Sequence, residues 1–306
     1  MKVLVTGGAG FIGSHVCEHM LRDGHTVIVF DNLSSGKLSN IDGLFNQYPI
    51  SFIKGDITSE TDLQLIPACD AVVHLAAAIS VIESMSNPRK YEETNVEGSR
   101  KVYEWAKSHG VTTIVSASSA AVYGDAPPPL DESAANGGLS PYAQTKFEME
   151  KVGRQFESLK CHYLRFFNVY GPRQDPTSPY TGAISIFMDR STTNRDITVF
   201  GDGEQTRDFV SVSDVAAAIK MLITTPDLER QTLNVGTSST ISINELVDVI
   251  LVLTGSKSKV THGDERAGEI KHSCANTDAI RRLGWAPNVE LRDGLGELVE
   301  WFVGQQ

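Results

Sequence analysis

Tyr142 and Lys146 are the two residues whose types and spacing most directly suggest proton chemistry. They stand four positions apart in a stretch with a helical pattern, so their side chains share one helix face. A phenol has a pKa of about 10 and is a useful base at neutral pH only where positive charge stabilises the phenolate. The Lys146 ammonium can supply such charge, and Ser119 can hold a substrate hydroxyl by a hydrogen bond. These three residues predict an acid–base site.

A glycine-rich turn near the N-terminus predicts a dinucleotide site. The β-branched run at residues 3–5 leads into Gly7, Gly10 and Gly13 and then into a helical pattern. Glycines let the backbone approach a pyrophosphate, whose charge lies at the free N–H groups of the helix N-terminus. A second strand ends at Asp31, where a carboxylate can accept hydrogen bonds from ribose hydroxyls. Asp31 would repel a 2′-phosphate, so the pattern favours NAD over NADP.

Asp56 follows the third expected strand. Two interpretations of this aspartate stay open at this point. It is a candidate for contact with the adenine edge, and it is equally a candidate for a turn or helix-cap residue.

The pattern of elements predicts the scaffold that positions these residues. Apolar β-branched runs alternate with helical patterns, and the expected strands are residues 3–5, 26–30, 51–53, 71–74, 112–116 and 162–166. Continuous apolar runs are typical of parallel strands buried on both faces. The fold class is therefore α/β: a Rossmann-type doubly wound parallel sheet with a smaller mixed α/β substrate lobe. We expect the NAD-binding domain over 1–172, with a return strand near 232–236, and the substrate lobe over 173–306.

Composition narrows the function further. The formal net charge of −11 disfavours nucleic acid and anionic membrane surfaces as partners. Four scattered cysteines without a CxxC pair suggest neither a metal site nor a disulfide framework. The N-terminus lacks the pattern of a signal peptide, and no run reaches the ~18 apolar residues of a membrane span. We expect a cytoplasmic protein.

The motifs together resemble the extended short-chain dehydrogenase/reductase superfamily. The resemblance rests on Thr6-Gly7-Gly8-Ala9-Gly10-Phe11-Ile12-Gly13, Asp31-Asn32-Leu33, His74-Leu75-Ala76-Ala77, Ser119, and Tyr142 with Lys146. It covers essentially the whole chain. Residues 164–173 and 201–210 are similar to the nucleotide-sugar epimerase branch, which implies NAD-dependent chemistry on a UDP- or dTDP-sugar.

The resemblance implies roles for particular residues. The implied NAD-binding residues are Gly7, Gly10, Phe11, Ile12, Gly13, Asp31, Asn32, Ser35, Gly36, Asp56, Ile57, Leu75, Ala76, Ala77, Asn95, Tyr142 and Lys146. The implied substrate-binding residues are Ser80, Ser84, Ser119, Tyr142, Asn168, Phe200, Arg207, Arg266 and Ser273. Asn168, Arg207 and Arg266 match diphosphate contacts, and Phe200 matches the ring beside uracil. Local cations suit a dianionic diphosphate entering an acidic protein.

Ala120 and Ala121 bear on the reaction. The related 4,6-dehydratases carry an acidic residue directly after the catalytic serine or threonine, whereas this chain has two alanines there. The similarity therefore implies a UDP-hexose 4-epimerase that works through a 4-keto intermediate. A UDP-glucuronate or UDP-pentose 4-epimerase is the near alternative, and a non-catalytic NAD-binding regulator is the distant one.

Ser273 concerns the size of the sugar. It matches a family position where a tyrosine closes the pocket of strict glucose/galactose epimerases, so a serine implies room for the N-acetyl group of UDP-GlcNAc and UDP-GalNAc. The stretch with Ser80 and Ser84 resembles epimerases of N-acetylated hexosamines, although Ile82 stands where that pattern usually has proline.

Family members commonly form homodimers, and we expect one here. The expected contact pairs the helix around residues 95–109 with the helix of Tyr142. Its apolar side chains would be Val102, Trp105, Ala106, Phe147 and Phe156.

Overall fold

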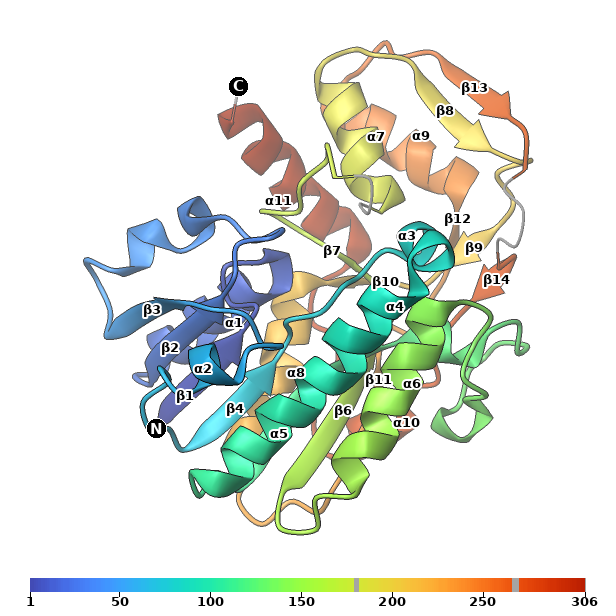
Figure 1. Ribbon diagram of the computed structural model, residues 1–306. Coiled ribbons are helices and arrows are strands. Elements are labelled where there is room, and N and C mark those ends of the chain that lie inside the picture. The colour runs from blue at the N-terminus through green and yellow to red at the C-terminus, as the bar shows by residue number, and fades with distance from the viewer. Residues whose placement is uncertain (179–181, 266–269, 306) are drawn as a thin grey trace. The chain divides into compact units, whose positions relative to one another are not determined.

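A seven-stranded sheet is the largest element of the computed structural model, which describes residues 1–178, 182–265 and 270–305 (Figure 1). The strand order is β11-β6-β5-β4-β1-β2-β3, and β1 pairs in parallel with both β2 and β4. The strands are β1 (Lys2–Thr6), β2 (Thr26–Asp31), β3 (Ile50–Lys54), β4 (Ala71–His74), β5 (Thr113–Ser119), β6 (Lys160–Phe166) and β11 (Thr232–Val235). The expected Rossmann-type sheet is confirmed.

Helices cover both faces of this sheet, as the continuous buried apolar runs of its central strands require. Helices α5 (Ser99–Ser108) and α6 (Pro141–Arg154) lie together on the face toward the viewer in Figure 1, and α1 (Phe11–Arg22) and α8 (Val212–Thr224) lie behind it. An ion pair of 2.7 Å between Lys220 and Asp23 joins α8 to the end of α1. Shorter elements complete this part: α2 (Glu60–Leu63), α3 (Val81–Ser86), α4 (Pro88–Tyr91), the π-helix Glu92–Gly98 and the 3₁₀ turns Leu38–Asn40, Asp42–Leu44 and Ala120–Tyr123.

Side chains of α5 and α6 fill a core against the sheet. Val102 and Ala106 are fully buried and Trp105 is only 3% exposed, and all three belong to the core that also contains Met149 and Val152 of α6. The expectation that Val102, Trp105 and Ala106 offer apolar surface to a second copy is therefore wrong. Their spacing reflects packing against the chain's own sheet, which produces the same helical pattern as an interface. The homodimer itself stays a prediction.

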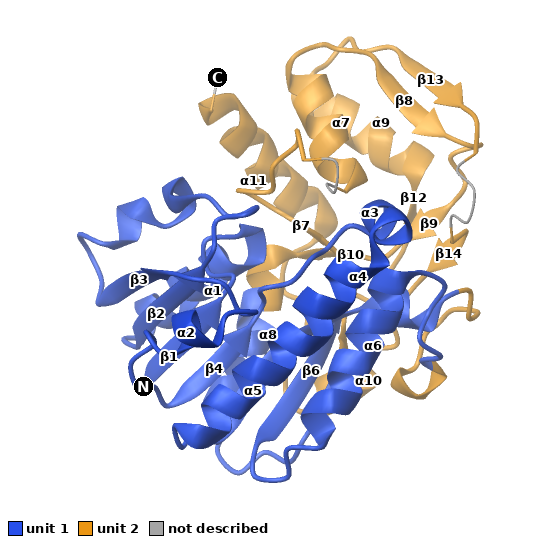
Figure 2. Cartoon of the chain, in the orientation of Figure 1, with its two compact units in different colours: residues 1–124, 135–165, 216–233 blue, residues 125–134, 166–215, 234–306 orange. Residues whose placement is uncertain are grey.

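Packing divides the chain into two compact units (Figure 2). Unit 1 comprises residues 1–124, 135–165 and 216–233, and unit 2 comprises residues 125–134, 166–215 and 234–306. The units are thus interleaved along the chain. The functional division expected from the sequence, with NAD bound by residues 1–172 and substrate by residues 173–306, stays a prediction.

Unit 2 has its own core and several short strands. Helices α7 (Ala183–Thr192), α9 (Ile243–Thr254) and α11 (Leu291–Gly304) pack their apolar faces together, with Met188, Ile250 and Leu298 fully buried. The remaining elements are β7 (Asn168–Tyr170), β8 (Ile197–Phe200), β9 (Thr206–Arg207), β10 (Phe209–Ser211), β12 (Ile241–Ser242), β13 (Val260–Gly263), β14 (His272–Ser273), the 3₁₀ turn Glu132–Ala134 and α10 (Asp278–Arg282). Helix α9 begins with a capping box of Ser242 and Glu245 and ends at Gly255, whose φ is +62°.

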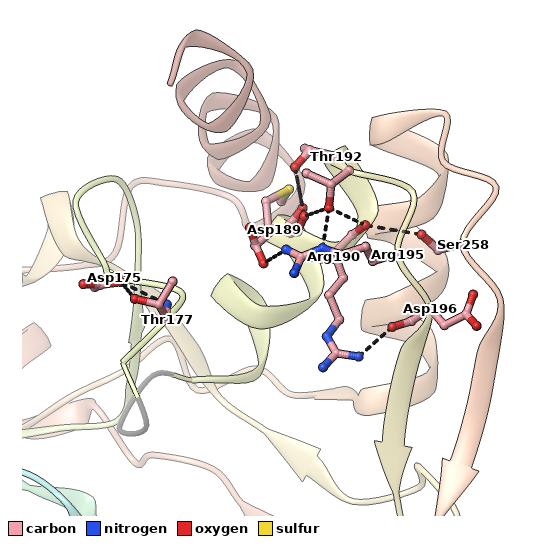
Figure 3. Close-up of polar contacts among 10 residues, drawn as sticks. Asp175, Thr177, Asp189, Arg190, Thr192, Arg195, Asp196 and Ser258 are labelled. Carbon is pink, nitrogen blue, oxygen red and sulfur yellow. Dashed lines mark hydrogen bonds and ion pairs between the residues drawn. The ribbon is translucent and has the colours of Figure 1, made fainter. Parts of the chain in front are cut away.

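Side-chain contacts close the turn between α7 and β8 (Figure 3). Arg190 donates a hydrogen bond of 2.7 Å to the backbone oxygen of Asp196, and Arg195 forms an ion pair with Asp189. The Ser258 hydroxyl donates to the backbone oxygen of Arg190 at 3.4 Å, which ties the segment before β13 to the end of α7. These contacts support the parallel pair of β8 and β13.

A buried ion pair fastens α6 to the sheet. Arg165 of β6 donates to both carboxylate oxygens of Glu150, at 2.9 and 2.7 Å, and the two side chains are 2% and 0% exposed. Ser118 at the end of β5 donates to Glu150 at 2.6 Å, and Arg165 also donates to the Tyr123 hydroxyl at 3.2 Å. The carboxylate is therefore fully engaged without water, which is the condition under which a buried ion pair is tolerated.

Replacing Arg165 by methionine should lower the free energy of unfolding by about 3–5 kcal/mol, because it removes the buried guanidinium that pairs with both oxygens of Glu150. Only the half-exposed Arg154, at 3.4 Å, would then face this carboxylate. The double variant Arg165→Met/Glu150→Gln should recover much of that loss, because no buried charge remains. Urea unfolding followed by circular dichroism measures both. A single variant within 1 kcal/mol of the wild type, or a double variant no better than the single, would contradict this account.

Candidate active site

The turn between β1 and α1 forms a concave loop lined by backbone. Gly7 has φ +71°, and a Cβ there would lie 2.7 Å from the backbone nitrogen of Ala76. A Cβ on Gly13 would lie 2.1 Å from the Gly7 oxygen, so both positions need glycine for space. Helix α1 begins after Gly10, and in the described part of the chain no side chain caps it. Its first N–H groups therefore suit a pyrophosphate, and the residues present fit NAD.

Asp31 ties the end of β2 to this loop. Its carboxylate accepts hydrogen bonds from the backbone N–H groups of Ala9 at 3.0 Å and Leu33 at 2.8 Å. Burial raises the pKa of Asp31, and these two hydrogen bonds oppose that rise. A Cβ on Gly36 would lie 3.0 Å from the same carboxylate, and the neighbouring Ser35 is exposed. The ribose contact of this region stays a prediction, and the structure shows that Asp31 also shapes the loop.

Asp56 and Asn32 meet beyond the ends of β3 and β2. The Asn32 amide donates to Asp56 at 2.8 Å, and the backbone and hydroxyl of Thr58 donate to the other carboxylate oxygen at 2.8 and 2.7 Å. Burial would raise the pKa of Asp56, but these hydrogen bonds lower it overall. Asp56 and Thr58 line a hollow of about 320 Å³, whereas the side chain of Ile57 is buried in the core. Both interpretations of Asp56, turn residue and adenine contact, are compatible with this geometry.

A directed chain of hydrogen bonds runs behind the segment Leu75, Ala76 and Ala77. The Ser99 hydroxyl donates to the Asn95 oxygen at 2.6 Å, so its own oxygen must accept from His74 Nε2 at 2.8 Å. His74 Nδ1 then accepts from the Thr6 hydroxyl at 2.8 Å. Burial lowers the pKa of His74 to about 3, so the ring is neutral and has one tautomer.

Asn95 joins two parts of the site through its side chain. Its amide oxygen accepts from the Ala78 N–H at 2.8 Å, and its amide nitrogen donates to the Ala78 oxygen at 3.0 Å and to Thr145 of α6 at 3.1 Å. Asn95 lies in the π-helix Glu92–Gly98 and is 1% exposed. It positions the chain after β4 against α6, and a contact with NAD stays a prediction.

Ser119, Tyr142 and Lys146 are brought together between β5 and α6. Ser119 lies close enough to Tyr142 for its hydroxyl to lower the pKa of the phenol, and Lys146 donates to the backbone oxygen of Ala117 at 2.9 Å. Helix α6 begins directly before Tyr142, with Ser140 as N-cap and Pro141 in the first turn. The structure therefore assembles the expected acid–base group within unit 1.

Burial shifts both titrating groups toward their neutral forms. It raises the pKa of Tyr142, against a lowering by the Ser119 hydrogen bond, and it lowers the pKa of Lys146 to about 8. A phenolate at Tyr142 therefore needs further positive charge. The oxidised nicotinamide ring of NAD is the charge that the fold is suited to add.

Tyr91 lies against Tyr142 and was not anticipated from the sequence. The two rings meet edge to face with centroids 6.4 Å apart. Its hydroxyl accepts from the Ser80 N–H at 3.0 Å and donates to Glu83 at 3.1 Å, and Glu83 is also held by Lys90 at 2.6 Å. The one sequence signal for this residue is its aromatic type, one helical turn after Pro88.

Ser80 and Ser84 use their hydroxyls locally. Ser80 is the N-cap of α3 and accepts from the Glu83 N–H at 2.9 Å, and Ser84 donates to the Val81 oxygen at 2.6 Å. Ser84 is fully buried and Ser80 is 4% exposed. Their contact with a sugar stays a prediction, and the structure gives both serines a role in shaping α3.

In unit 2 the structure brings together Asn168, Arg207 and Ser273. Ser273 of β14 lies in register with Arg207 of β9, and neighbouring residues in register share one face of a sheet. Asn168 begins β7, which pairs in parallel with β10 directly after residue 208. Phe200 is 38% exposed and lines a separate hollow with Gln205 and Lys271. Arg266 lies outside the described residues.

Comparison with known proteins identifies the class that this geometry suggests. The NAD dependent epimerase/dehydratase family matches residues 3–236. The chain belongs to that family. The expected enzyme family and NAD as its cofactor are thereby confirmed. In the described residues, no helix is long and apolar enough to cross a membrane.

Individual relatives agree along nearly the whole chain. UDP-glucose 4-epimerase of Mycolicibacterium smegmatis is 37% identical over 311 residues, covering 99% of this chain and 98% of that protein. The structure of UDP-N-acetylglucosamine 4-epimerase from Methanobrevibacter ruminantium, in complex with UDP-N-acetylmuramic acid, is 35% identical with a TM-score of 0.94 and covers 100% and 99% of the two chains. UDP-glucuronic acid 4-epimerase from Bacillus cereus, in complex with UDP-glucuronic acid and NAD, is 28% identical with a TM-score of 0.91 and full coverage of both.

The lowered pKa of Lys146 predicts how stability depends on pH. In protein freed of NAD, the folded pKa is about 8 and the unfolded value is 10.5, so between these values the unfolded chain binds more protons and stability rises with pH. Relative to Lys146→Met, the wild type should gain about 2 kcal/mol of unfolding free energy from pH 7.5 to 9.5. Urea titrations at both pH values measure this difference. If the unfolding free energies of the two proteins depend equally on pH, the pKa of Lys146 is not lowered in the folded state.

Proposed function

We propose that this enzyme is a UDP-hexose 4-epimerase that interconverts UDP-glucose and UDP-galactose, and also UDP-GlcNAc and UDP-GalNAc. The observation that carries the proposal is the assembly of Ser119, Tyr142 and Lys146, with a loop that fits NAD on the same unit. The relatives, which are named 4-epimerases of UDP-sugars, support it.

Tyr142 is the proposed acid–base residue. As phenolate it accepts the proton of the C4 hydroxyl, and Ser119 holds that hydroxyl by a hydrogen bond. The Lys146 ammonium stabilises the phenolate by its charge. When bound, NAD would supply the acceptor and donor of the C4 hydride. The 4-keto ring must turn within the pocket between the two transfers, so that the hydride comes back on its opposite face and C4 is inverted. Tyr142 then gives its proton back to the C4 oxygen, so protons and electrons balance over one cycle.

Ala120 and Ala121 support epimerisation over dehydration. They follow Ser119 in the 3₁₀ turn Ala120–Tyr123, and the Ala121 N–H donates to the Ser119 oxygen at 3.1 Å. Methyl side chains at these positions provide no proton for elimination of a C6 hydroxyl. The turn therefore orients Ser119 without adding a second acid.

Ser273 supports the wider sugar range. Its position in register with Arg207 puts a small side chain beside a proposed diphosphate residue. UDP-glucuronate remains the second candidate substrate, because a relative with that activity matches the whole chain. A UDP-pentose is a further candidate, and a substrate panel distinguishes these sugars. A non-catalytic NAD-binding regulator is disfavoured, because Ser119, Tyr142 and Lys146 are present and assembled.

Replacing Tyr142 by phenylalanine should reduce kcat at least 100-fold, because the variant cannot exchange the proton at the C4 oxygen. Affinity for UDP-glucose should stay within about threefold of the wild type. Turnover assays and calorimetric titration measure the two quantities. Tyr91→Phe is the matched control, because it removes the neighbouring hydroxyl and keeps the ring. A Tyr142→Phe variant that turns over at the wild-type rate would refute the mechanism.

Replacing Ser273 by tyrosine should reduce kcat/KM for UDP-GlcNAc and UDP-GalNAc at least tenfold and spare UDP-glucose and UDP-galactose, because a filled pocket excludes the acetamido group. His272→Tyr is the control, since the adjacent residue on a strand faces the other side. The substrate panel includes UDP-glucuronate and UDP-xylose. Wild-type enzyme inactive on acetylated sugars, or a variant that treats both pairs alike, would exclude Ser273 as the determinant.

A further inference from the structure

We infer that Asp208 is a positioning residue that holds the nucleotide-diphosphate-binding residues of unit 2 in place. The inference rests on the proposed function, which assigns Asn168, Arg207 and Ser273 to the substrate. Asp208 stands between β9, which carries Arg207, and β10, which pairs with the strand of Asn168. It touches no substrate in this scheme and acts through its neighbours.

The Asp208 side chain joins three segments that are far apart in the sequence. The fully buried carboxylate accepts from the Thr237 N–H at 2.8 Å, the Thr237 hydroxyl at 2.7 Å, the Ser238 N–H at 3.0 Å and the Ala275 N–H at 3.1 Å. Burial raises the pKa of Asp208, and these donors oppose the rise. Four donors on two oxygens fit a carboxylate and not an amide.

Gly236 shows how closely this cluster is packed. A Cβ at this position would lie 2.9 Å from the Asp208 carboxylate and 2.7 Å from the Ala275 side chain. The glycine therefore lets the chain after β11 approach both residues. The Asp208 carboxylate has little room to move within this cluster.

The backbone of Asp208 holds Asn168. The Asp208 oxygen accepts from the Asn168 N–H at 3.1 Å and from its side-chain amide at 3.0 Å. The orientation of the Asn168 side chain thus depends directly on the position of Asp208.

Asp208 also influences Arg207 and Ser273. Arg207 precedes it in the chain, and the Arg207 guanidinium donates to the backbone oxygens of Thr206 at 2.9 Å and Lys271 at 3.3 Å. Ser273 pairs with Arg207, and two residues later Ala275 donates to the Asp208 carboxylate. Asp208 therefore links all three proposed contacts: its backbone oxygen holds Asn168, its carboxylate holds the segment that follows Ser273, and it directly follows Arg207.

Asp208→Asn keeps the volume of the side chain and places an NH₂ group against N–H donors. The dissociation constant for UDP, measured by calorimetry on the NAD-loaded enzyme, should rise at least tenfold. KM for UDP-glucose should rise in parallel, and kcat at saturating substrate should stay within about threefold, because Tyr142 and Ser119 are unchanged. Bound NAD should be retained.

Asp214→Asn is the matched control. Asp214 is also buried in unit 2, at 4% exposure, and accepts backbone N–H groups of Asn288 at 2.9 Å and Val289 at 3.1 Å, which fasten the start of α8 to the segment before α11. It should lower thermal stability and leave the UDP dissociation constant within twofold. Equal weakening of UDP binding by the two variants, or wild-type binding by Asp208→Asn, would overturn the inference.

Thr237→Val tests the same contact with less risk to folding, because the Thr237 N–H still donates to Asp208. The variant loses the hydroxyl hydrogen bond to Asp208 and the two local hydrogen bonds of 3.2 Å between that hydroxyl and the backbone of Ser239. It should raise the UDP dissociation constant about threefold with kcat unchanged, and an unchanged dissociation constant would count against the inference. A wild-type enzyme that does not bind UDP at all would instead overturn the proposed function. The failures of the two proposals are therefore distinguishable.

Discussion

The ion pair between Glu150 and Arg165 holds the helix that carries the proposed catalytic residues Tyr142 and Lys146. Tyr142, Lys146 and Glu150 follow one another at intervals of four residues on α6, so fastening the third of them to β6 fixes the face that carries the other two. Ser118 donates to the same carboxylate and directly precedes Ser119. One buried carboxylate therefore aligns the end of β5 with the catalytic helix, and its full set of donors makes that burial tolerable.

Burial also sets the chemical character of the site. Lys146 is 4% exposed and burial lowers its pKa to about 8. The positive ring of oxidised NAD would add to the lysine charge in stabilising a phenolate at Tyr142. His74 is buried and neutral, and its hydrogen bonds to Thr6 and Ser99 join β1 to α5. The arrangement thus links NAD binding to the pKa of Tyr142, the proposed base.

Unit 2 uses the same device with a different group. Asp208 is buried with four donors, as Glu150 is buried with its arginine and serine. In both units a carboxylate that faces no solvent connects segments that are distant in sequence. Such networks define one arrangement of the chain, because a partly satisfied carboxylate would be costly in a low-dielectric interior.

Sequence alone determined the features that depend on local pattern. Glycine spacing predicted the loop at Gly7 and Gly13, because a tight turn excludes Cβ, and apolar runs predicted β1–β6, because buried parallel strands are apolar on both faces. The i and i+4 spacing placed Tyr142 beside Lys146.

Tertiary structure decided the rest. Val102 and Trp105 form the same helical pattern whether they meet a partner or the sheet, and only packing showed that they meet the sheet. The strands β9, β12 and β14 have two residues each, which is too short to show the alternation of apolar and polar residues typical of a strand. The buried roles of Tyr91 and Asp208 come from contacts with residues tens of positions away, which no local pattern encodes.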